Sequence, residues 1–123
     1  MPNLFQLGNF NLHAGQSSDY KIDCDALTTD DIDTCAFLIA KALGNEFSEV
    51  IGVPRGGLRL ADAMKQYSTD GWPPLIVDDV YTTGTSIREF RTSNYALGAV
   101  IFNRAGDAID SWVYGLFNLG DGI

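Results

Sequence analysis

The sequence predicts an α/β fold: a doubly wound, mostly parallel sheet with helices on both faces. Three observations predict it. Short apolar runs at residues 49–53, 75–77 and 96–102 have the length and composition of strands buried on both faces. Residues 29–43 and 58–67 carry apolar side chains at helical spacing. Turn-forming residues separate these segments, so that strands and helices alternate within a single domain.

The first helix is expected to begin at Thr28 or Thr29, either of which can cap its amino terminus. Its first turn is rich in aspartate, which interacts favourably with the helix dipole. Its apolar stripe comprises Ile32, Cys35, Ala36, Ile39 and Leu43. The pair Gly44-Asn45 is a typical helix stop.

The remaining elements follow the same alternation. In order, they are a strand at 49–53, a helix at 58–67, a strand at 75–77, a short helix from Ile87, a strand at 96–102 and a candidate last strand at 112–117. Residues 68–74 form a turn-rich connection between the second helix and the strand at 75–77.

The composition describes one globular domain. The chain has 123 residues, of which 46% are hydrophobic and 20% are charged. Sixteen acidic residues against eight basic ones give a net charge of −8, which argues against nucleic acid as a partner. An anionic ligand would therefore need a local group of cations. The candidates are Lys21, Arg55, Arg59 and Arg88.

The sequence indicates neither membrane insertion nor export. No apolar run approaches the roughly 18 residues of a membrane span, and the first residues lack the layout of a signal peptide. We therefore expect a cytoplasmic protein. Cys24 and Cys35, with one histidine in the chain, do not make a zinc-binding set, and we expect both to be packing thiols.

The most informative segment is the strand at 75–77, which leads through Asp78 and Asp79 into a polar loop. We call this loop the hydroxyl loop; it comprises Thr82, Thr83, Gly84, Thr85 and Ser86. Open α/β sheets bind ligands where a strand ends and a helix begins. Hydroxyls and accessible N–H groups suit a phosphate, whereas carboxylates suit a sugar diol or a divalent cation. The segment therefore predicts a sugar-phosphate site; the alternative is an ordinary turn with capping hydroxyls.

A second candidate anion site follows the strand at 49–53. We call residues 52–57 the glycine loop, in which Gly56 and Gly57 leave N–H groups accessible and Arg55 adds a permanent cation. The structural alternative is a tight turn with a surface arginine. Two candidate anion sites at successive strand ends indicate ligand binding more specifically than either site does alone. Arg59, one turn further on, is expected to be a solvent-exposed helix residue.

Residues 75–86 resemble the ribose-phosphate signature of the type I phosphoribosyltransferases. The resemblance implies that Asp78 and Asp79 are the catalytic acids that hold the ribose of phosphoribosyl pyrophosphate, while the hydroxyl loop holds its 5′-phosphate. It also implies that Arg55, Gly56 and Gly57 bind pyrophosphate. The implied cofactor is Mg²⁺, held mostly through substrate oxygens with help from Asp78 or Asp79. A homodimer is implied as well. A Walker B strand also ends in acids, but the sequence lacks the glycine-rich loop that it requires.

Residues 10–23 are similar to the opening of orotate phosphoribosyltransferases. The positions that fit are Phe10, Leu12, Gly15, Ser18 and Tyr20, and His13 stands where many of these enzymes carry a lysine. In those enzymes this segment forms a hood over the base, which implies that Tyr20, Lys21 and Ile22 face the nucleobase. Lys21 is a candidate to pair with a carboxylate such as that of orotate. We call residues 1–28 the hood and residues 29–123 the α/β core; the structural alternative for the hood is an edge hairpin.

The sequence departs from this family at one place. Full-size orotate enzymes insert a mobile basic loop with a catalytic lysine before the signature strand, whereas here no Lys or Arg occurs between Lys65 and Arg88. We expect a pentosyltransferase that joins ribose 5-phosphate to a nucleobase, plausibly a pyrimidine, and that is slowed by the missing loop. The alternative is a non-catalytic regulatory protein that binds phosphoribosyl pyrophosphate or a nucleotide. Trp112 is a further candidate to stack on a base, although packing explains its strand equally well.

Overall fold

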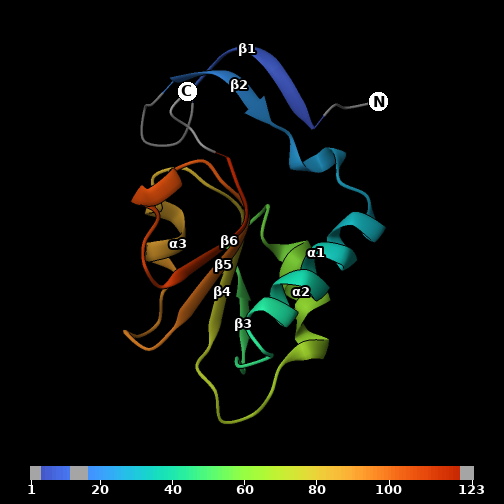
Figure 1. Cartoon of the computed structure of the whole chain (residues 1–123), viewed down its shortest axis with the longest axis vertical. Helices are drawn as coiled ribbons and strands as arrows, with labels where there is room; N and C mark the ends of the chain where they lie inside the picture. The colour runs from blue at the N-terminus through green and yellow to red at the C-terminus, as the bar shows by residue number, and fades with distance from the viewer. Residues whose placement is uncertain (1–3, 12–16, 120–123) are drawn as a thin grey trace.

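The computed structural model describes residues 4–11 and 17–119. Its centre is a four-stranded parallel sheet whose strands lie in chain order (Figure 1). The strands are β3 (Val50–Gly52), β4 (Leu75–Tyr81), β5 (Leu97–Asn103) and β6 (Val113–Asn118). The sheet confirms the predicted α/β fold, and β6 confirms the candidate last strand.

Both faces of the sheet are buried, as the uninterrupted apolar runs predict. Leu75 and Val77 on β4 pack into one core cluster with helices of the chain, whereas Ile76 between them packs into a second cluster on the other face. β5 repeats the pattern, with Ala99 in the first cluster and Val100 in the second. Because side chains alternate along a strand, an all-apolar run must be covered by other elements on both sides.

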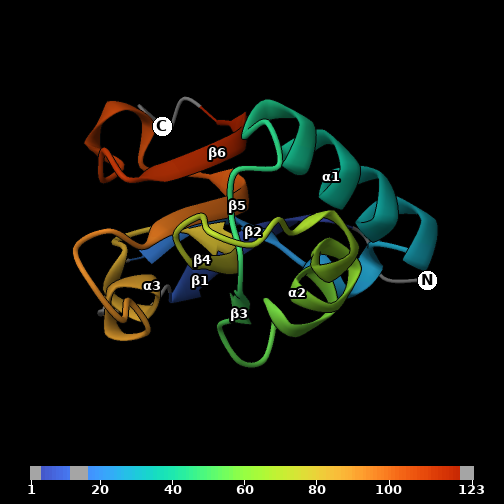
Figure 2. The ribbon, with the colours of Figure 1, turned by 90° about the horizontal axis from the view of Figure 1, so that it is seen from below.

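Helices supply this cover. α1 (Thr29–Ala42) and α2 (Leu58–Met64) lie on one side of the sheet, and the short α3 (Thr85–Glu89) lies on the other (Figure 2). The 3-10 turn η3 (Lys65–Tyr67) extends α2, and a second one, η4 (Gly106–Ala108), follows β5. None of the helices in the described part of the chain has the length and apolar character that a membrane span requires.

The first helix has the ends that its sequence predicts. Thr28 is its N-cap: the Thr28 hydroxyl accepts from the Asp31 N–H, and the Asp31 carboxylate accepts from the Thr28 N–H. At the other end, Gly44 and Asn45 both adopt positive φ angles, of 63° and 58°. Such a left-handed turn ends a helix, because glycine and asparagine tolerate it best.

The strand boundaries differ from the prediction in two places. β3 is shorter than 49–53, although hydrogen bonds from Leu75 N–H to the Glu49 carbonyl and from Val53 N–H to the Val77 carbonyl extend its pairing with β4. β4 is longer than 75–77 and continues to Tyr81, still paired with β5. The two aspartates therefore lie inside a paired strand, not directly after its end.

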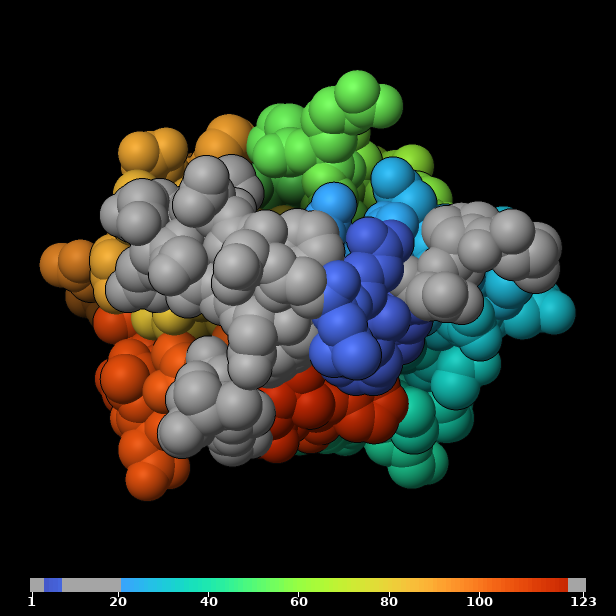
Figure 3. Space-filling model, turned by 90° about the horizontal axis from the view of Figure 1, so that it is seen from above, coloured from blue at the N-terminus to red at the C-terminus, as the bar shows by residue number. Residues whose placement is uncertain are grey.

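The hood contains a separate two-stranded antiparallel sheet, β1 (Phe5–Asn11) and β2 (Ser17–Ile22), followed by the 3-10 turn η2 (Cys24–Ala26). This small sheet lies over the carboxyl ends of the core strands (Figure 1). The Phe5 ring meets Phe102 edge to face at 6.3 Å between ring centroids, and residues 4–7 lie beside β6 in the view from above (Figure 3). His13 lies outside the described residues.

The connection at residues 68–74 lies at the opposite end of the sheet from the hood (Figure 1). It is held there by hydrogen bonds from Thr69 N–H to the Phe47 carbonyl, 2.7 Å, and from Ser48 N–H to the Pro73 carbonyl, 2.9 Å. The strand that follows it, Leu75–Tyr81, is about 20 Å long at the usual rise per residue. The connection is therefore too short and too distant to cover the carboxyl ends of the strands.

Candidate functional site

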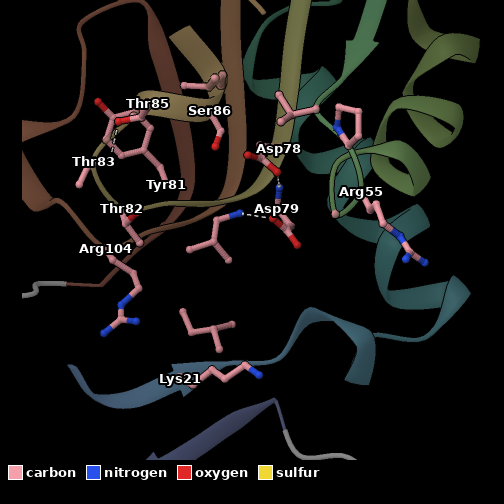
Figure 4. A pocket seen from close by; sticks show the side chains of 17 residues that line it. Lys21, Arg55, Asp78, Asp79, Tyr81, Thr82, Thr83, Thr85, Ser86 and Arg104 are labelled. Atoms are coloured by element: carbon pink, nitrogen blue, oxygen red, sulfur yellow. Dashed lines mark hydrogen bonds between the residues drawn. The ribbon is translucent and has the colours of Figure 1, made fainter. Parts of the chain in front are cut away.

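A pocket of about 610 Å³ lies between the carboxyl ends of the core strands and β2 of the hood (Figure 4). Its volume is in the range of small-molecule sites, and its place in the sheet is where open α/β folds bind ligands. The lining residues are Lys21, Ile22, Val53, Pro54, Arg55, Gly56, Asp78, Asp79, Val80, Tyr81, Thr82, Thr83, Gly84, Thr85, Ser86, Ile87 and Arg104.

Most of the residues proposed from the sequence meet in this pocket. Both aspartates, the whole hydroxyl loop, and Arg55 and Gly56 of the glycine loop line it, as do Lys21 and Ile22 of the hood. Gly57 does not: it is buried, and it caps the start of α2 behind the lining residues. The side chain of Tyr20 lies outside the described residues, so its predicted contact with a base stays a prediction.

The two aspartates form a compact acidic pair on β4. An Asp78 carboxylate oxygen accepts from the Asp79 N–H at 2.8 Å, and an Asp79 oxygen accepts from the Val80 N–H at 2.8 Å. Asp78 is buried, with 9% of its surface exposed, whereas Asp79 is half-buried. Backbone donors and the paired strand therefore fix both carboxylates at the wall of the pocket.

The environment of Asp78 favours its protonated form. Burial raises the pKa of Asp78 from 3.8 to about 8, and a side-chain hydrogen bond with Asp79 and the negative charge of Asp79 add to the rise. Two adjacent carboxylates in a partly dry site cannot both ionise without a cation or donor nearby. The acidic pair is therefore suited to bind a cation or to accept hydrogen bonds from ligand hydroxyls.

The glycine loop touches this acidic pair. A Cβ atom added to Gly56 would stand 2.0 Å from an Asp79 carboxylate oxygen, so only glycine fits where the loop passes β4. The peptide bond between Pro54 and Arg55 is cis. Arg55 is exposed at the edge of the pocket, on the far side of the acidic pair from the hydroxyl loop (Figure 4). Close packing against Asp79 is therefore as good a reason for a glycine at position 56 as anion binding is. Packing does not account for the exposed Arg55 in the same way.

The hydroxyl loop turns sharply from β4 into α3. Gly84 makes the turn with a φ of 83°, in the left-handed region that favours glycine. The hydroxyls of Thr83 and Thr85 lie 3.0 Å apart, within hydrogen-bonding distance of each other, and both residues line the pocket. The loop thus brings several hydroxyls together at one end of the pocket, which is the arrangement that a phosphate requires.

Arg88 supports the hydroxyl loop without lining the pocket. Its guanidinium donates to the Thr83 carbonyl at 2.9 Å and forms an ion pair with Asp110 at 2.8 Å. The same group donates to the Tyr81 hydroxyl at 3.4 Å, and that hydroxyl accepts from the Asp110 N–H at 3.1 Å. The hydrogen bond to Asp110 raises the pKa of Arg88 further, so the side chain stays charged. The proposed role of Arg88 as a ligand-facing cation is therefore replaced by a supporting one.

Arg104 is a pocket residue that the sequence analysis missed. It directly follows β5, has 3% of its surface exposed, and extends into the pocket toward β2 (Figure 4). Its place, directly after a parallel strand that neighbours β4, is the signal that the sequence offered, but a lone arginine there is not a recognisable pattern. A buried arginine is rare in a globular protein, which makes this position informative.

The cations of the pocket lie around the acidic pair. Arg55 stands on one side, whereas Arg104 and Lys21 of the hood stand on another (Figure 4). Ile22, next to Lys21, is buried and adds an apolar surface to the same wall. An anionic ligand can therefore be neutralised locally in spite of the chain's net charge of −8.

The acidic pair also fits a magnesium ion that a phosphorylated ligand brings with it. Mg²⁺ in phosphate-transfer sites is usually held by one or two carboxylates together with substrate phosphates. Within residues 4–11 and 17–119, no group of three or more metal-binding side chains gathers in one place. Among the described lining residues, Asp78 and Asp79 supply the carboxylates that would hold the ion together with the substrate.

Arg59 differs from its sequence expectation. Although exposed, it is not simply solvated: its guanidinium donates to the Leu27 carbonyl at 3.0 Å and to the Cys24 carbonyl at 2.9 Å. Sequence patterns could not reveal these bonds, because they join α2 to a segment more than thirty residues earlier.

Solved structures resemble the whole chain. No protein-family model matches the sequence, and no curated protein is similar enough to it to count as a match. Orotate phosphoribosyltransferase from Aeropyrum pernix superposes with a TM-score of 0.72 at 24% identity, covering 94% of this chain and 88% of that one. The Mycobacterium tuberculosis orotate phosphoribosyltransferase gives 0.66 at 16% identity, covering 98% and 93%.

A hypoxanthine-guanine phosphoribosyltransferase from Bacillus anthracis is a more distant likeness. Its TM-score is 0.53 at 11% identity, over 95% of this chain and 85% of that one. Since the parallel sheet, the flanking helices and the coverage agree in these comparisons, the chain has the type I phosphoribosyltransferase fold, with a structural likeness to orotate phosphoribosyltransferases.

Proposed function

We propose that this protein is a phosphoribosyltransferase that joins the ribose 5-phosphate of phosphoribosyl pyrophosphate to a nucleobase and releases pyrophosphate. One observation carries the proposal: an acidic pair, a hydroxyl loop and a group of cations line a single pocket at the carboxyl ends of the strands. Each part matches the chemistry of one part of such a substrate, namely a diol, a phosphate and an anionic group.

The ribosyl end of the substrate is assigned to β4 and the loop after it. Asp78 and Asp79 accept hydrogen bonds from the ribose hydroxyls, and the hydroxyl loop binds the 5′-phosphate. Arg55 and the N–H groups near Gly56 bind the pyrophosphate, while Gly57 supports the loop from behind. The contact between Gly56 and Asp79 supports this arrangement, because it puts the pyrophosphate and ribose sites side by side.

The base end is assigned to Lys21, Ile22 and Arg104. Two cations and an apolar side chain suit a flat base that carries a negative charge, so we propose a pyrimidine carboxylate such as orotate. An uncharged base would lack the charge-assisted hydrogen bonds that a carboxylate can accept from these side chains, and it should bind more weakly.

In the proposed reaction a ring nitrogen of the base loses its proton to solvent and forms a bond to the anomeric carbon, as the bond from that carbon to the pyrophosphate oxygen breaks. The electron pair leaves with pyrophosphate, and the ribose gains oxocarbenium character. Asp78 and Asp79 hold the ribose in place for this step and Arg55 stabilises the departing charge. Mg²⁺, when bound with the substrate, neutralises part of the negative charge of the pyrophosphate.

A second candidate function is favoured by the short connection at residues 68–74. This connection is held at the far end of the sheet, and no residue of it lines the pocket. Because this connection does not close over the site, water has easier access and turnover is expected to be slow. A regulatory protein that binds phosphoribosyl pyrophosphate or a nucleotide without turnover would fit the same pocket.

Pyrophosphate release separates the two functions. The protein is mixed with Mg²⁺, phosphoribosyl pyrophosphate and either orotate, uracil, hypoxanthine or no base. We expect base-dependent release, fastest with orotate. Tight binding of phosphoribosyl pyrophosphate with no release in any mixture would support the regulatory alternative and contradict the transferase.

Two further expectations belong to the proposal. We propose a homodimer, which light scattering coupled to size-exclusion chromatography would test by giving twice the monomer mass. We also propose that the protein works in the cytoplasm, where phosphoribosyl pyrophosphate and Mg²⁺ are available; fractionation of cells with an antibody to the protein would test this.

A further inference from the structure

The last residues of the hood, before the core begins, accept hydrogen bonds from one side chain of α2. Arg59 donates from its two terminal nitrogens to the Leu27 and Cys24 carbonyls, and the bond to Cys24 is partly buried. Arg59 is the second residue of α2, the helix that begins directly after the glycine loop. A single planar guanidinium therefore connects the end of the hood to the helix that starts at the candidate pyrophosphate site.

The segment that Arg59 holds is also tied to the rest of the hood and lies close to the acidic pair. Gln6 on β1 donates to the Asp23 carboxylate at 2.9 Å, and the Asp23 N–H donates to the Leu4 carbonyl. The Cys24 thiol is buried near Asp79: burial and the negative charge of Asp79 raise the pKa of the thiol. Residues 23–27 are thus the junction through which the hood and α2 meet, close to the acidic pair.

We propose that Arg59 is a positioning residue that fixes the hood over the pocket and thereby sets the place of Lys21 and Ile22. Both residues directly precede the junction at the end of β2, so a shift of the junction moves them relative to Asp78, Asp79 and Arg104. This inference rests on the proposed function for its kinetic consequence. Its structural consequence, that Arg59 keeps the hood ordered, does not depend on which ligand the protein binds.

The expected effect is confined to the base end of the pocket. Replacing Arg59 removes two charge-assisted hydrogen bonds, but the contact of Phe5 with Phe102 still attaches the hood to the core. The hood is then expected to remain folded while populating more than one position. The ribosyl end, which is built from β4 and the hydroxyl loop, has no contact with Arg59 in the described hydrogen bonds and keeps its geometry.

Three variants test this role. Arg59→Met removes both hydrogen bonds and keeps an apolar stem, and Arg59→Lys keeps a charge that can serve one carbonyl. The control is Lys65→Met, which removes an exposed ion pair with Asp62 beyond the end of α2. Hydrogen–deuterium exchange of residues 17–27 is measured without any ligand, and KM values for the base and for phosphoribosyl pyrophosphate are measured with ligands.

We expect Arg59→Met to speed exchange in residues 17–27 and to raise KM for the base about 10-fold, a loss typical of one or two hydrogen bonds to a charged group. KM for phosphoribosyl pyrophosphate and the exchange of β4 should stay unchanged. For Arg59→Lys, the exchange rate of residues 17–27 and KM for the base should both lie between the values for wild type and Arg59→Met. For Lys65→Met, both should equal the wild-type values.

The outcomes distinguish this role from the proposed function. If no base is turned over by the wild-type protein, the exchange measurement still tests the positioning role by itself. Unchanged exchange of residues 17–27 in Arg59→Met would overturn the role. Equal rises in both KM values, or a general rise in exchange throughout the core, would also overturn it, because they would indicate a merely structural residue.

Discussion

The two ends of the pocket are built in different ways. The proposed ribosyl end comes from nine consecutive residues, 78–86, on one strand and the loop that follows it. The proposed base end joins Lys21 of the hood to Arg104 after β5, two residues that are far apart in the chain. When the residues of a site are contiguous, the sequence shows them as a motif. When the fold brings distant residues together, the sequence shows no such motif. The base end is therefore where the structure adds most to the sequence.

The largest loss is expected when the ribosyl end is broken. Changing Asp78 and Asp79 together to Asn keeps their size and removes both carboxyl groups. We expect kcat/KM to fall about 1,000-fold, because the ribose and its Mg²⁺ lose their charged ligands. Pyrophosphate release measures this loss. The control Asp107→Asn, at an exposed position of η4 outside the pocket, should keep full activity; unchanged activity in the double variant would mean that the acidic pair is wrongly assigned.

The next largest loss should come from the base end and depend on the charge of the base. Arg104→Met should raise KM for orotate about 30-fold, since a hydrogen-bonded ion pair in a buried site is lost. KM for uracil should change little. Arg104→Lys should retain part of the preference for orotate, and Lys41→Met on the outer face of α1 serves as the control. If Arg104→Met raised KM equally for orotate and uracil, Arg104 would not be the residue that recognises the carboxylate of orotate.

A smaller effect is expected from the turn of the hydroxyl loop. In Gly84→Ala the new Cβ would stand 2.5 Å from the Tyr81 hydroxyl, and φ would remain at 83°. We expect KM for phosphoribosyl pyrophosphate to rise about 10-fold through displacement of the loop. Gly71→Ala is a matched control, since Gly71 also has a positive φ but a Cβ there would meet no atom within 4 Å. If both variants bind the substrate equally well, the loop does not depend on this turn.

The last expected effect concerns the pH dependence of stability, not activity, and it follows from the pKa of Asp78. The folded protein retains on Asp78 a proton that the unfolded chain releases near pH 4, because burial raises the pKa to about 8. Its contribution to stability is thus fully present below pH 4 and is lost as the pH rises through about 8. Asp78→Asn abolishes this loss.

Thermal unfolding in EDTA at pH 5 and pH 9 measures the difference. Relative to wild type, Asp78→Asn should gain about 4 kcal/mol of unfolding free energy between these two pH values. An equal stability difference at both pH values would show that Asp78 titrates normally in the folded protein.

Much of the fold could be predicted from local patterns. Thr28 and the Gly44-Asn45 pair mark the two ends of α1, and the apolar runs mark β4 and β5. The exact strand ends could not be predicted, because pairing with β5 carries β4 past its apolar run to Tyr81. Strand ends depend on a partner strand, which the local sequence does not contain.

The candidate site follows the same division. Asp78, Asp79 and the hydroxyl loop were found because strand, acids and hydroxyls are contiguous. Arg104 was missed because a single arginine after a strand is not a pattern, and Arg59 was misjudged because its partners lie on another element. Arg88 was selected as a candidate cation for an anionic ligand, but its hydrogen bonds turn it toward Thr83 and Asp110 instead of the pocket.

The most direct test of the central claim is a crystal structure of the protein with phosphoribosyl pyrophosphate and Mg²⁺. We expect the 5′-phosphate within hydrogen-bonding distance of the hydroxyl loop, the ribose hydroxyls on Asp78 and Asp79, and the anomeric carbon facing Lys21 and Arg104. A ligand bound elsewhere, or bound here with its phosphate away from the hydroxyl loop, would contradict the account.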